Sequence, residues 1–80
     1  MRILAIGGAG FIGRQVVGRL VAQGHVVHVP TRQFQHGREL LVHPTVTVMQ
    51  ADIHDDAALE RLVAGCDVVM NCGLAEEGAS

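Results

Sequence analysis

The chain of 80 residues contains no lysine, no tyrosine and no tryptophan, and its only phenyl rings belong to Phe11 and Phe34. Without larger aromatic rings, the interior must be built from alanine, valine, leucine, isoleucine and glycine, a composition that suits parallel strands buried under helices. All six basic side chains are scattered arginines, and the formal net charge is −2. This charge distribution argues against a surface that binds nucleic acid.

Long apolar runs are also missing, since none approaches the roughly 20 residues that a helix needs to cross a membrane. The glycines and then Arg14 interrupt the apolar N-terminal stretch, which argues against a secretory signal. Cys66 and Cys72 are separated by five residues and match no metal or redox motif. We therefore expect two buried, reduced thiols in a cytoplasmic protein. The five histidines are dispersed, so we expect them to face solvent and to form no metal site.

Hydrophobic periodicity and turn residues divide the chain into alternating strands and helices. Strands are predicted at 2–6, 25–30, 45–50 and 67–71, helices at 13–23 and 55–64, and a short helix at 38–43. Gly24 should end the first helix in a left-handed conformation, Pro30 should end the second strand, and Gly18 should mark where the first helix lies against the sheet. Because a crossover separates each strand from the next, the strands should be parallel, with helices on both faces.

A glycine-rich turn joins the first predicted strand to the first predicted helix. Residues 7 to 13 read Gly-Gly-Ala-Gly-Phe-Ile-Gly. They satisfy the spacing Gly-x-Gly-x-x-Gly through Gly8, Gly10 and Gly13, and the alternative Gly-x-x-Gly-x-x-Gly through Gly7, Gly10 and Gly13. Between a strand and a helix, such a turn lets backbone N–H groups cradle a nucleotide pyrophosphate. The motif predicts a Rossmann-type α/β unit of about four strands; the alternative is a turn that only packs helix on strand.

The same segment resembles the cofactor loop of the extended and atypical short-chain dehydrogenase/reductases, a family of NAD(P)-dependent epimerases, dehydratases and related reductases. Their loop commonly reads Gly-Gly-x-Gly-Phe-Ile-Gly. Further resemblances lie at Gly24-His25, at 51–55 (Ala-Asp-Ile-His-Asp) and at 67–71 (Asp-Val-Val-Met-Asn), up to about Gly73. The resemblance implies that residues 1–80 are the N-terminal half of an NAD(P)-binding Rossmann domain, with a frayed polar tail at 73–80.

The resemblance also implies which residues hold the pyrophosphate. Gly7, Gly10 and Gly13 would surround it, and Phe11 and Ile12 would present backbone N–H groups to it. Phe11 and Ile12 have an alternative interpretation as ordinary core residues.

The adenosine half of the cofactor is implied to lie at the ends of the third and fourth strands. Asp52 would accept a hydrogen bond from the adenine amino group, with Ile53 beside the ring. Asn71, Cys72 and Gly73 would lie under the ribose. Asp52 could equally cap the helix that follows it, a role that aspartate fills readily, and the two roles are compatible.

The choice of cofactor depends on the residues that follow the second strand. NAD-preferring members of the family carry an acidic residue there, which bonds the ribose hydroxyls, whereas this sequence has Thr31 followed by Arg32. A carboxylate would repel a 2′-phosphate, and an arginine can form a charge-assisted pair with one. We therefore expect NADP to be favoured over NAD; the alternative for Arg32 is an ordinary solvated side chain.

The family's catalytic pair is a tyrosine and a lysine four positions apart, and this chain contains neither. We expect no catalytic residue within it, because no activated phenol is available for proton transfer. Three functions remain open. The chain could be the cofactor-binding half of an epimerase, dehydratase or reductase, a non-catalytic NADP-binding or redox-sensing module, or a truncated remnant that binds no nucleotide.

Self-association is a further expectation. A half domain of this size buries proportionally little surface. The fourth strand would also leave an apolar edge unpaired. We expect copies of the chain to associate through that edge or through a bare helix face.

Overall fold

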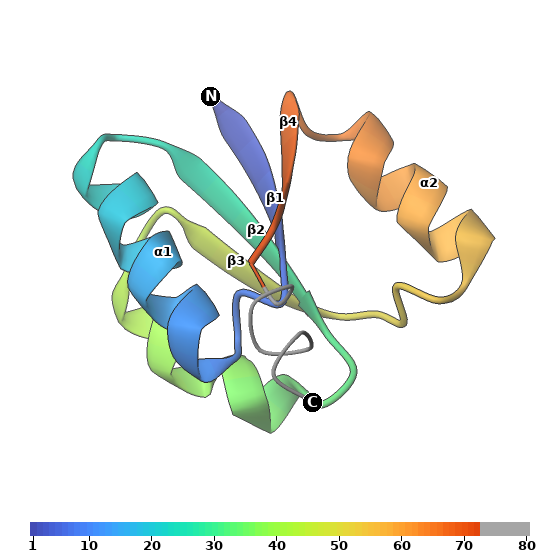
Figure 1. The fold of residues 1–80 in the computed structure, drawn as a ribbon, viewed down its shortest axis with the longest axis horizontal. Helices are drawn as coiled ribbons and strands as arrows, with labels where there is room; N and C mark the ends of the chain where they lie inside the picture. Colours follow the sequence, from blue (N-terminus) through green and yellow to red (C-terminus); the bar gives the residue numbers. More distant parts are fainter. Residues whose placement is uncertain (73–80) are drawn as a thin grey trace.

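The computed structural model describes residues 1–72, so Gly73 and the tail expected at 73–80 lie outside the described residues. Four strands and three helices alternate along the chain (Figure 1). In chain order they are β1 (Arg2–Ile6), α1 (Phe11–Ala22), β2 (Val26–Thr31), the 3-10 helix η1 (Phe34–Val42), β3 (Val46–Gln50), α2 (Asp56–Ala64) and β4 (Val68–Asn71).

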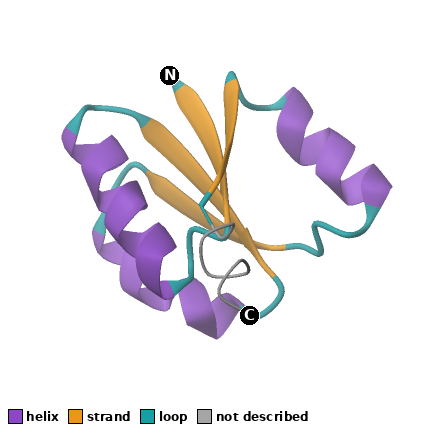
Figure 2. Ribbon diagram, viewed as in Figure 1, coloured by secondary structure: helices purple, strands orange, loops and turns teal. Residues whose placement is uncertain are grey.

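The four strands form one sheet in the order β3-β2-β1-β4, and every neighbouring pair is parallel. Helices α1 and η1 lie on one side of this sheet and α2 lies on the other (Figures 1 and 2). The predicted α/β sheet with helices on both faces is therefore confirmed. The chain first builds outward from β1 to β2 and β3, then returns to place β4 on the opposite side of β1.

The core lies between the sheet and the α1 and η1 layer. Val27 and Val29 of β2 are fully buried, and they pack in one cluster with Val17 of α1 and Leu40 of η1. Burying each such side chain contributes about 1.5–3 kcal/mol. By contrast, α2 contains no buried residue, and all four residues of β4 are exposed. The stable part of the fold is therefore β1 to β3 with α1 and η1.

Helix α1 ends as its sequence predicts. Gly24 has φ +88°, the left-handed conformation that costs glycine little. Its N–H donates to the Val21 carbonyl at 2.9 Å, and the N–H of His25 donates to the Leu20 carbonyl at 3.1 Å. These two bonds satisfy carbonyls at the end of the helix, and they turn the chain directly into β2.

Pro30 does not end β2, which continues for one further residue. The β1–β2 pairing stops at Leu4 and His28, and Pro30 is the next position of β2 whose nitrogen points toward β1. Pro30 thus lies beyond the end of the β1–β2 ladder, where the Ala5 carbonyl accepts from the N–H of Gly8 at 3.1 Å instead of from β2. Proline therefore fits inside the strand, since no ladder hydrogen bond is lost.

A helix is present where one is predicted at 38–43, but its bounds differ, because η1 is a 3-10 helix that runs from Phe34 to Val42. It is held against β3 by close packing. Leu40 is buried, and Gly37 lies so near Val48 that an added Cβ would approach a Val48 methyl to 2.5 Å. An ion pair between Arg14 and Glu39 ties η1 to α1.

The two glycines inside α1 have opposite surroundings. A Cβ on Gly13 would overlap the carbonyl oxygen of Gly7 and lie 2.8 Å from the Cα of Gly8, whereas a Cβ on Gly18 would meet no heavy atom within 4 Å. The expectation that Gly18 marks a close approach to the sheet is therefore wrong. Gly13 is the residue at which the helix touches the chain before it.

We expect Gly18→Ala to raise the free energy of unfolding by about 0.5–1 kcal/mol, because alanine is the better helix former and the added methyl meets open space. We expect Gly13→Ala to lower it by about 1–3 kcal/mol, because the same methyl forces the helix and the loop apart. Urea unfolding followed by far-UV circular dichroism measures both. A stabilised Gly13→Ala variant, or a destabilised Gly18→Ala variant, would contradict the packing described above.

Candidate functional site

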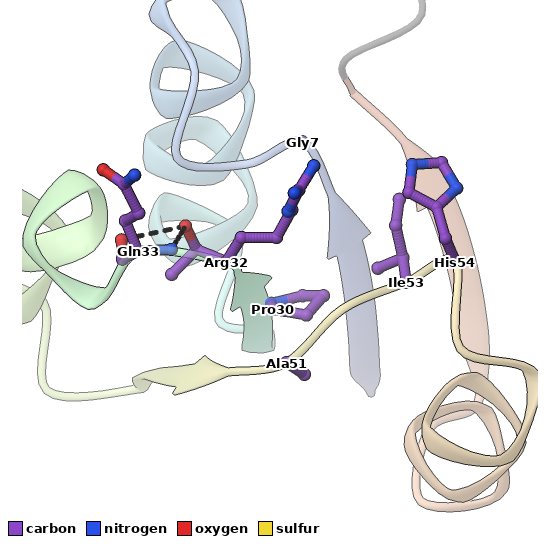
Figure 3. A pocket seen from close by; sticks show the side chains of 8 residues that line it. Gly7, Pro30, Arg32, Gln33, Ala51, Ile53 and His54 are labelled. Atoms are coloured by element: carbon purple, nitrogen blue, oxygen red, sulfur yellow. Dashed lines mark hydrogen bonds between the residues drawn. The ribbon is translucent and has the colours of Figure 1, made fainter.

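The main pocket lies where the carboxyl ends of β1, β2 and β3 meet, and it has a volume of about 510 Å³ (Figure 3). Its lining residues come from the ends of these strands and the loops that follow them: Gly7, Pro30, Thr31, Arg32, Gln33, Ala51, Ile53 and His54. The strand order of the sheet reverses between β1 and β4, at the same carboxyl edge and next to the β1 end of this pocket. In open parallel sheets, ligands bind at such a switch point.

The glycine loop forms the wall of the pocket that leads into α1. Gly7 has φ +80°, and its carbonyl accepts from the N–H of Gly10 at 3.0 Å, which closes a tight turn. Gly10 then caps α1 without a side-chain hydrogen bond, and the first turn of the helix contains no acidic residue. The positive end of the helix dipole is therefore not offset by a carboxylate of that turn. Such a helix start attracts an anion.

Phe11 and Ile12 open α1 at the surface. The side chain of Phe11 is 70% exposed and that of Ile12 is 40% exposed. The alternative that they are core residues is therefore wrong. Their side chains do not line the pocket, so any part they play in ligand binding falls to their backbone.

Arg32 is the one arginine among the lining residues of the pocket, and none of the others is a lysine or an acid. Its side chain extends from the end of β2 toward Gly7 (Figure 3). The ion pair found among the described residues joins Arg14 and Glu39. No carboxylate of these residues therefore lies within ion-pair distance of the Arg32 guanidinium. The site therefore presents an available cation beside the glycine loop.

Ile53 and His54 form the wall opposite Arg32 (Figure 3). His54 was not among the predicted site residues; its position next to Ile53 after the third strand is the signal that could have found it. Asp52 accepts the N–H of His54 at 2.9 Å and does not cap α2. That cap is Asp55, whose Oδ1 accepts the N–H of Ala57 at 3.0 Å, so the capping alternative for Asp52 is wrong.

Asn71 and Cys72 lie beside the start of the glycine loop and outside the main pocket. Asn71 is in register with Ile6, and the N–H of Cys72 donates to the Ile6 carbonyl at 2.6 Å. The Cys72 side chain is buried in the core, and this burial raises the pKa of its thiol. Cys72 is therefore a neutral packing residue at neutral pH, and a ligand can meet it only through its backbone.

Cys66 is half-buried on the other face of the sheet, where its Sγ lies 3.7 Å from Nδ1 of His28. Desolvation raises the pKa of the Cys66 thiol, Arg2 opposes the shift and Asp67 adds to it. His28, expected to face solvent, is thus only partly exposed. Within residues 1–72, no group of three or more potential ligands could hold a metal ion, and no helix is long and apolar enough to cross a membrane.

Among curated proteins, two relatives of this chain are dehydrogenases that act on steroids or sterols by name. The chain is 38% identical over 71 residues to a 3 beta-hydroxysteroid dehydrogenase/Delta 5-->4-isomerase of Mycobacterium tuberculosis, covering 88% of this chain and 18% of that protein. It is 27% identical over 70 residues to a decarboxylating sterol-4-alpha-carboxylate 3-dehydrogenase of Dictyostelium discoideum, covering 88% of this chain and 21% of the relative. The chain thus spans about a fifth of the length of these relatives.

Solved structures agree in fold. AtPrR2 with NADP+ and (+)pinoresinol has a TM-score of 0.73 and 26% identity, covering 88% of this chain and 25% of that one. The dTDP-glucose 4,6-dehydratase of Bacillus anthracis, solved with NAD, has a TM-score of 0.69 and 25% identity, covering 89% and 26%. The family model described as NAD(P)H-binding matches residues 7–80. The chain therefore belongs to the NAD(P)H-binding family, and the proteins similar to it include dehydrogenases, an epimerase and a dehydratase of the short-chain dehydrogenase/reductase type.

Proposed function

We propose that the pocket at the carboxyl ends of β1, β2 and β3 holds the adenosine half of the nicotinamide cofactor, and that it takes NADP in preference to NAD. The observation that carries the proposal is the position of Arg32, which extends across the pocket toward Gly7 with no ion-pair partner among the described residues. None of the residues that line the pocket is acidic.

The glycine loop fits the pyrophosphate of such a cofactor. Gly13 leaves no room for a Cβ beside Gly7, so the start of α1 stays close to the turn. Gly7, Gly10 and Gly13 would hold the two phosphates with the backbone of Phe11 and Ile12. A helix start without an acidic first turn favours these negative charges. When bound, the cofactor supplies hydride transfer.

The adenosine would lie between Arg32 and the opposite wall of the pocket. Ile53 offers an apolar side chain to the face of the adenine, and Asp52 would accept a hydrogen bond from its amino group. Of the two carboxylate oxygens of Asp52, only Oδ1 has a described partner, the N–H of His54. Asn71 and Cys72, beside the first residues of the glycine loop, would lie under the ribose; Gly73, the third residue of that set, lies outside the described residues.

The 2′-phosphate is the chemical difference between the two cofactors, and it favours a cation over a carboxylate. Arg32 supplies that cation. Thr31 stands where an acid would bond the ribose hydroxyls, and its hydroxyl is engaged with the backbone of Gln33. An arginine forms two parallel hydrogen bonds with a phosphate, which are stronger than neutral ones.

We expect Arg32→Ala to raise the dissociation constant for NADPH by about tenfold to a hundredfold, the loss of charged hydrogen bonds worth about 1.5–3 kcal/mol. The dissociation constant for NADH should change by less than about twofold, because NADH lacks the phosphate that Arg32 would meet. Enhancement of the cofactor's own fluorescence on titration measures both.

Arg61→Ala is the matched control, because it removes the same charge from the exposed surface of α2. It should leave both constants unchanged. The proposed preference would be contradicted if Arg32→Ala weakened the binding of NADPH and of NADH equally. It would also be contradicted if the unsubstituted chain bound NADH more tightly than NADPH.

We further propose that the bound cofactor serves an oxidoreductase or epimerase reaction. The curated relatives support this, since they include the two dehydrogenases named above and a UDP-glucose 4-epimerase of Streptococcus mutans. The 80 residues contain no tyrosine and no lysine. A catalytic tyrosine and lysine pair for this reaction would therefore have to come from residues other than these 80.

Copies of the chain are proposed to associate through β4, in the cytoplasm. Val68, Val69 and Met70 are 37%, 43% and 36% exposed, and β4 is the last strand of the described sheet. Pairing of two such edges would bury apolar side chains and satisfy the free backbone groups. Cys66 and Cys72 are free cysteines, and the proposed compartment would keep their thiols reduced.

We expect Val69→Lys to weaken self-association about tenfold or more, because a paired edge would bring two like charges together. Val42→Lys makes the same change on η1, at a side chain that is 77% exposed, and should leave association unchanged. Sedimentation equilibrium over a range of concentrations measures both. A monomer at all concentrations, or equal effects of the two variants, would overturn the proposal.

A further inference from the structure

Gln50 is the last residue of β3, and it reaches across to the loop that carries Arg32. It stands in register with Thr31, and its Nε2 donates to the carbonyl oxygen of Arg32 at 3.3 Å. With Arg32, Ala51 and Asp52 it lines a second pocket of about 480 Å³ beside the main one. Gln50 therefore touches the backbone of Arg32 without being part of the main pocket.

The backbone on both sides of Arg32 is held as well. The N–H of Ala51 donates to the Thr31 carbonyl at 2.9 Å, which extends the β2–β3 ladder to its last residue. The Thr31 hydroxyl accepts the N–H of Gln33 at 3.3 Å and lies 3.0 Å from the Gln33 carbonyl, to which it can donate. Arg32 is thus bracketed by two anchored residues, and Gln50 holds its own carbonyl.

The backbone of Arg32 is held by hydrogen bonds, whereas its side chain is available for a ligand. Among residues 1–72, its guanidinium has no ion-pair partner, and it points toward Gly7 (Figure 3). A fixed backbone with an available charged group lowers the ordering cost of binding, because less conformational freedom is lost when the ligand arrives.

We propose that Gln50 is a positioning residue for cofactor discrimination, acting on the 2′-phosphate through the backbone of Arg32. This inference rests on the proposed function, because it requires that Arg32 meets that phosphate. The proposal gives Gln50 no contact of its own with the cofactor, because Gln50 does not line the main pocket. Its contribution therefore depends on Arg32 and is confined to NADP.

The test is a double-mutant cycle between Gln50→Met and Arg32→Ala, read with NADPH and with NADH. Methionine has nearly the length of glutamine and no N–H, so it removes the hydrogen bond to Arg32 with little change in volume. We expect Gln50→Met to raise the dissociation constant for NADPH about threefold to tenfold, the range for one hydrogen bond. The constant for NADH should stay within about twofold, and the melting temperature should be nearly unchanged, because Gln50 is exposed.

In the Arg32→Ala background, Gln50→Met should have no further effect on NADPH, since the group that it positions is gone. Gln15→Met makes the same change on the exposed surface of α1 and should alter neither constant.

If Gln50→Met weakened the binding of NADPH and of NADH equally, the inference would be overturned, because Gln50 would then support the whole site. The inference would also be overturned if Gln50→Met left the dissociation constant for NADPH unchanged while Arg32→Ala still weakened the binding of NADPH and not of NADH. That result would leave the proposed function standing. No saturable binding of either cofactor by the unsubstituted chain would overturn both.

Discussion

The contact between the first turn of α1 and the glycine loop is the constraint on which the site and the core both depend. Gly13 lies so close to Gly7 and Gly8 that no side chain fits between them. Four residues along the helix, Val17 is fully buried, and a Cβ on Gly8 would lie 3.1 Å from one of its methyl groups. Lifting the helix to admit a methyl at Gly13 would therefore also loosen the core. The same approach holds the helix start beside the pocket, where it favours an anion.

A second constraint is the early end of the pairing between β1 and β2. The ladder stops at Leu4 and His28, and the Ala5 carbonyl then turns to the N–H of Gly8. The two strands diverge from that point: β1 leads into the glycine loop and β2 leads toward Arg32. The opening between them contributes to the pocket. Because β2 stays paired with β3 to its last residue, the Arg32 side of the pocket is tied to β3 through Gln50, independently of the glycine loop.

Much of this could be predicted from the sequence, because the relevant signals are local. Alternating valines and helical apolar stripes indicate the order of elements, and crossover connections then require parallel strands. Gly24 ends α1 as expected, since a left-handed cap depends on the residue itself and its own helix. The spacing of Gly7, Gly10 and Gly13 likewise predicts the turn, and the match of residues 7–80 to the NAD(P)H-binding family agrees with it. The sequence by itself thus determined the fold class, the position of the glycine loop and the kind of ligand.

The tertiary structure decided what depends on neighbours from other elements. The sequence predicts a close approach of α1 to the sheet at Gly18, whereas the structure shows open space there and close contact between Gly13 and the loop before the helix. Pro30 is accommodated inside a strand because it lies beyond the end of the β1–β2 ladder. His54 enters the pocket because the chain after β3 turns back across the end of β2. The bond from Gln50 to Arg32 joins residues 18 positions apart. These features arise from close packing and shared hydrogen-bond acceptors, which no local pattern records.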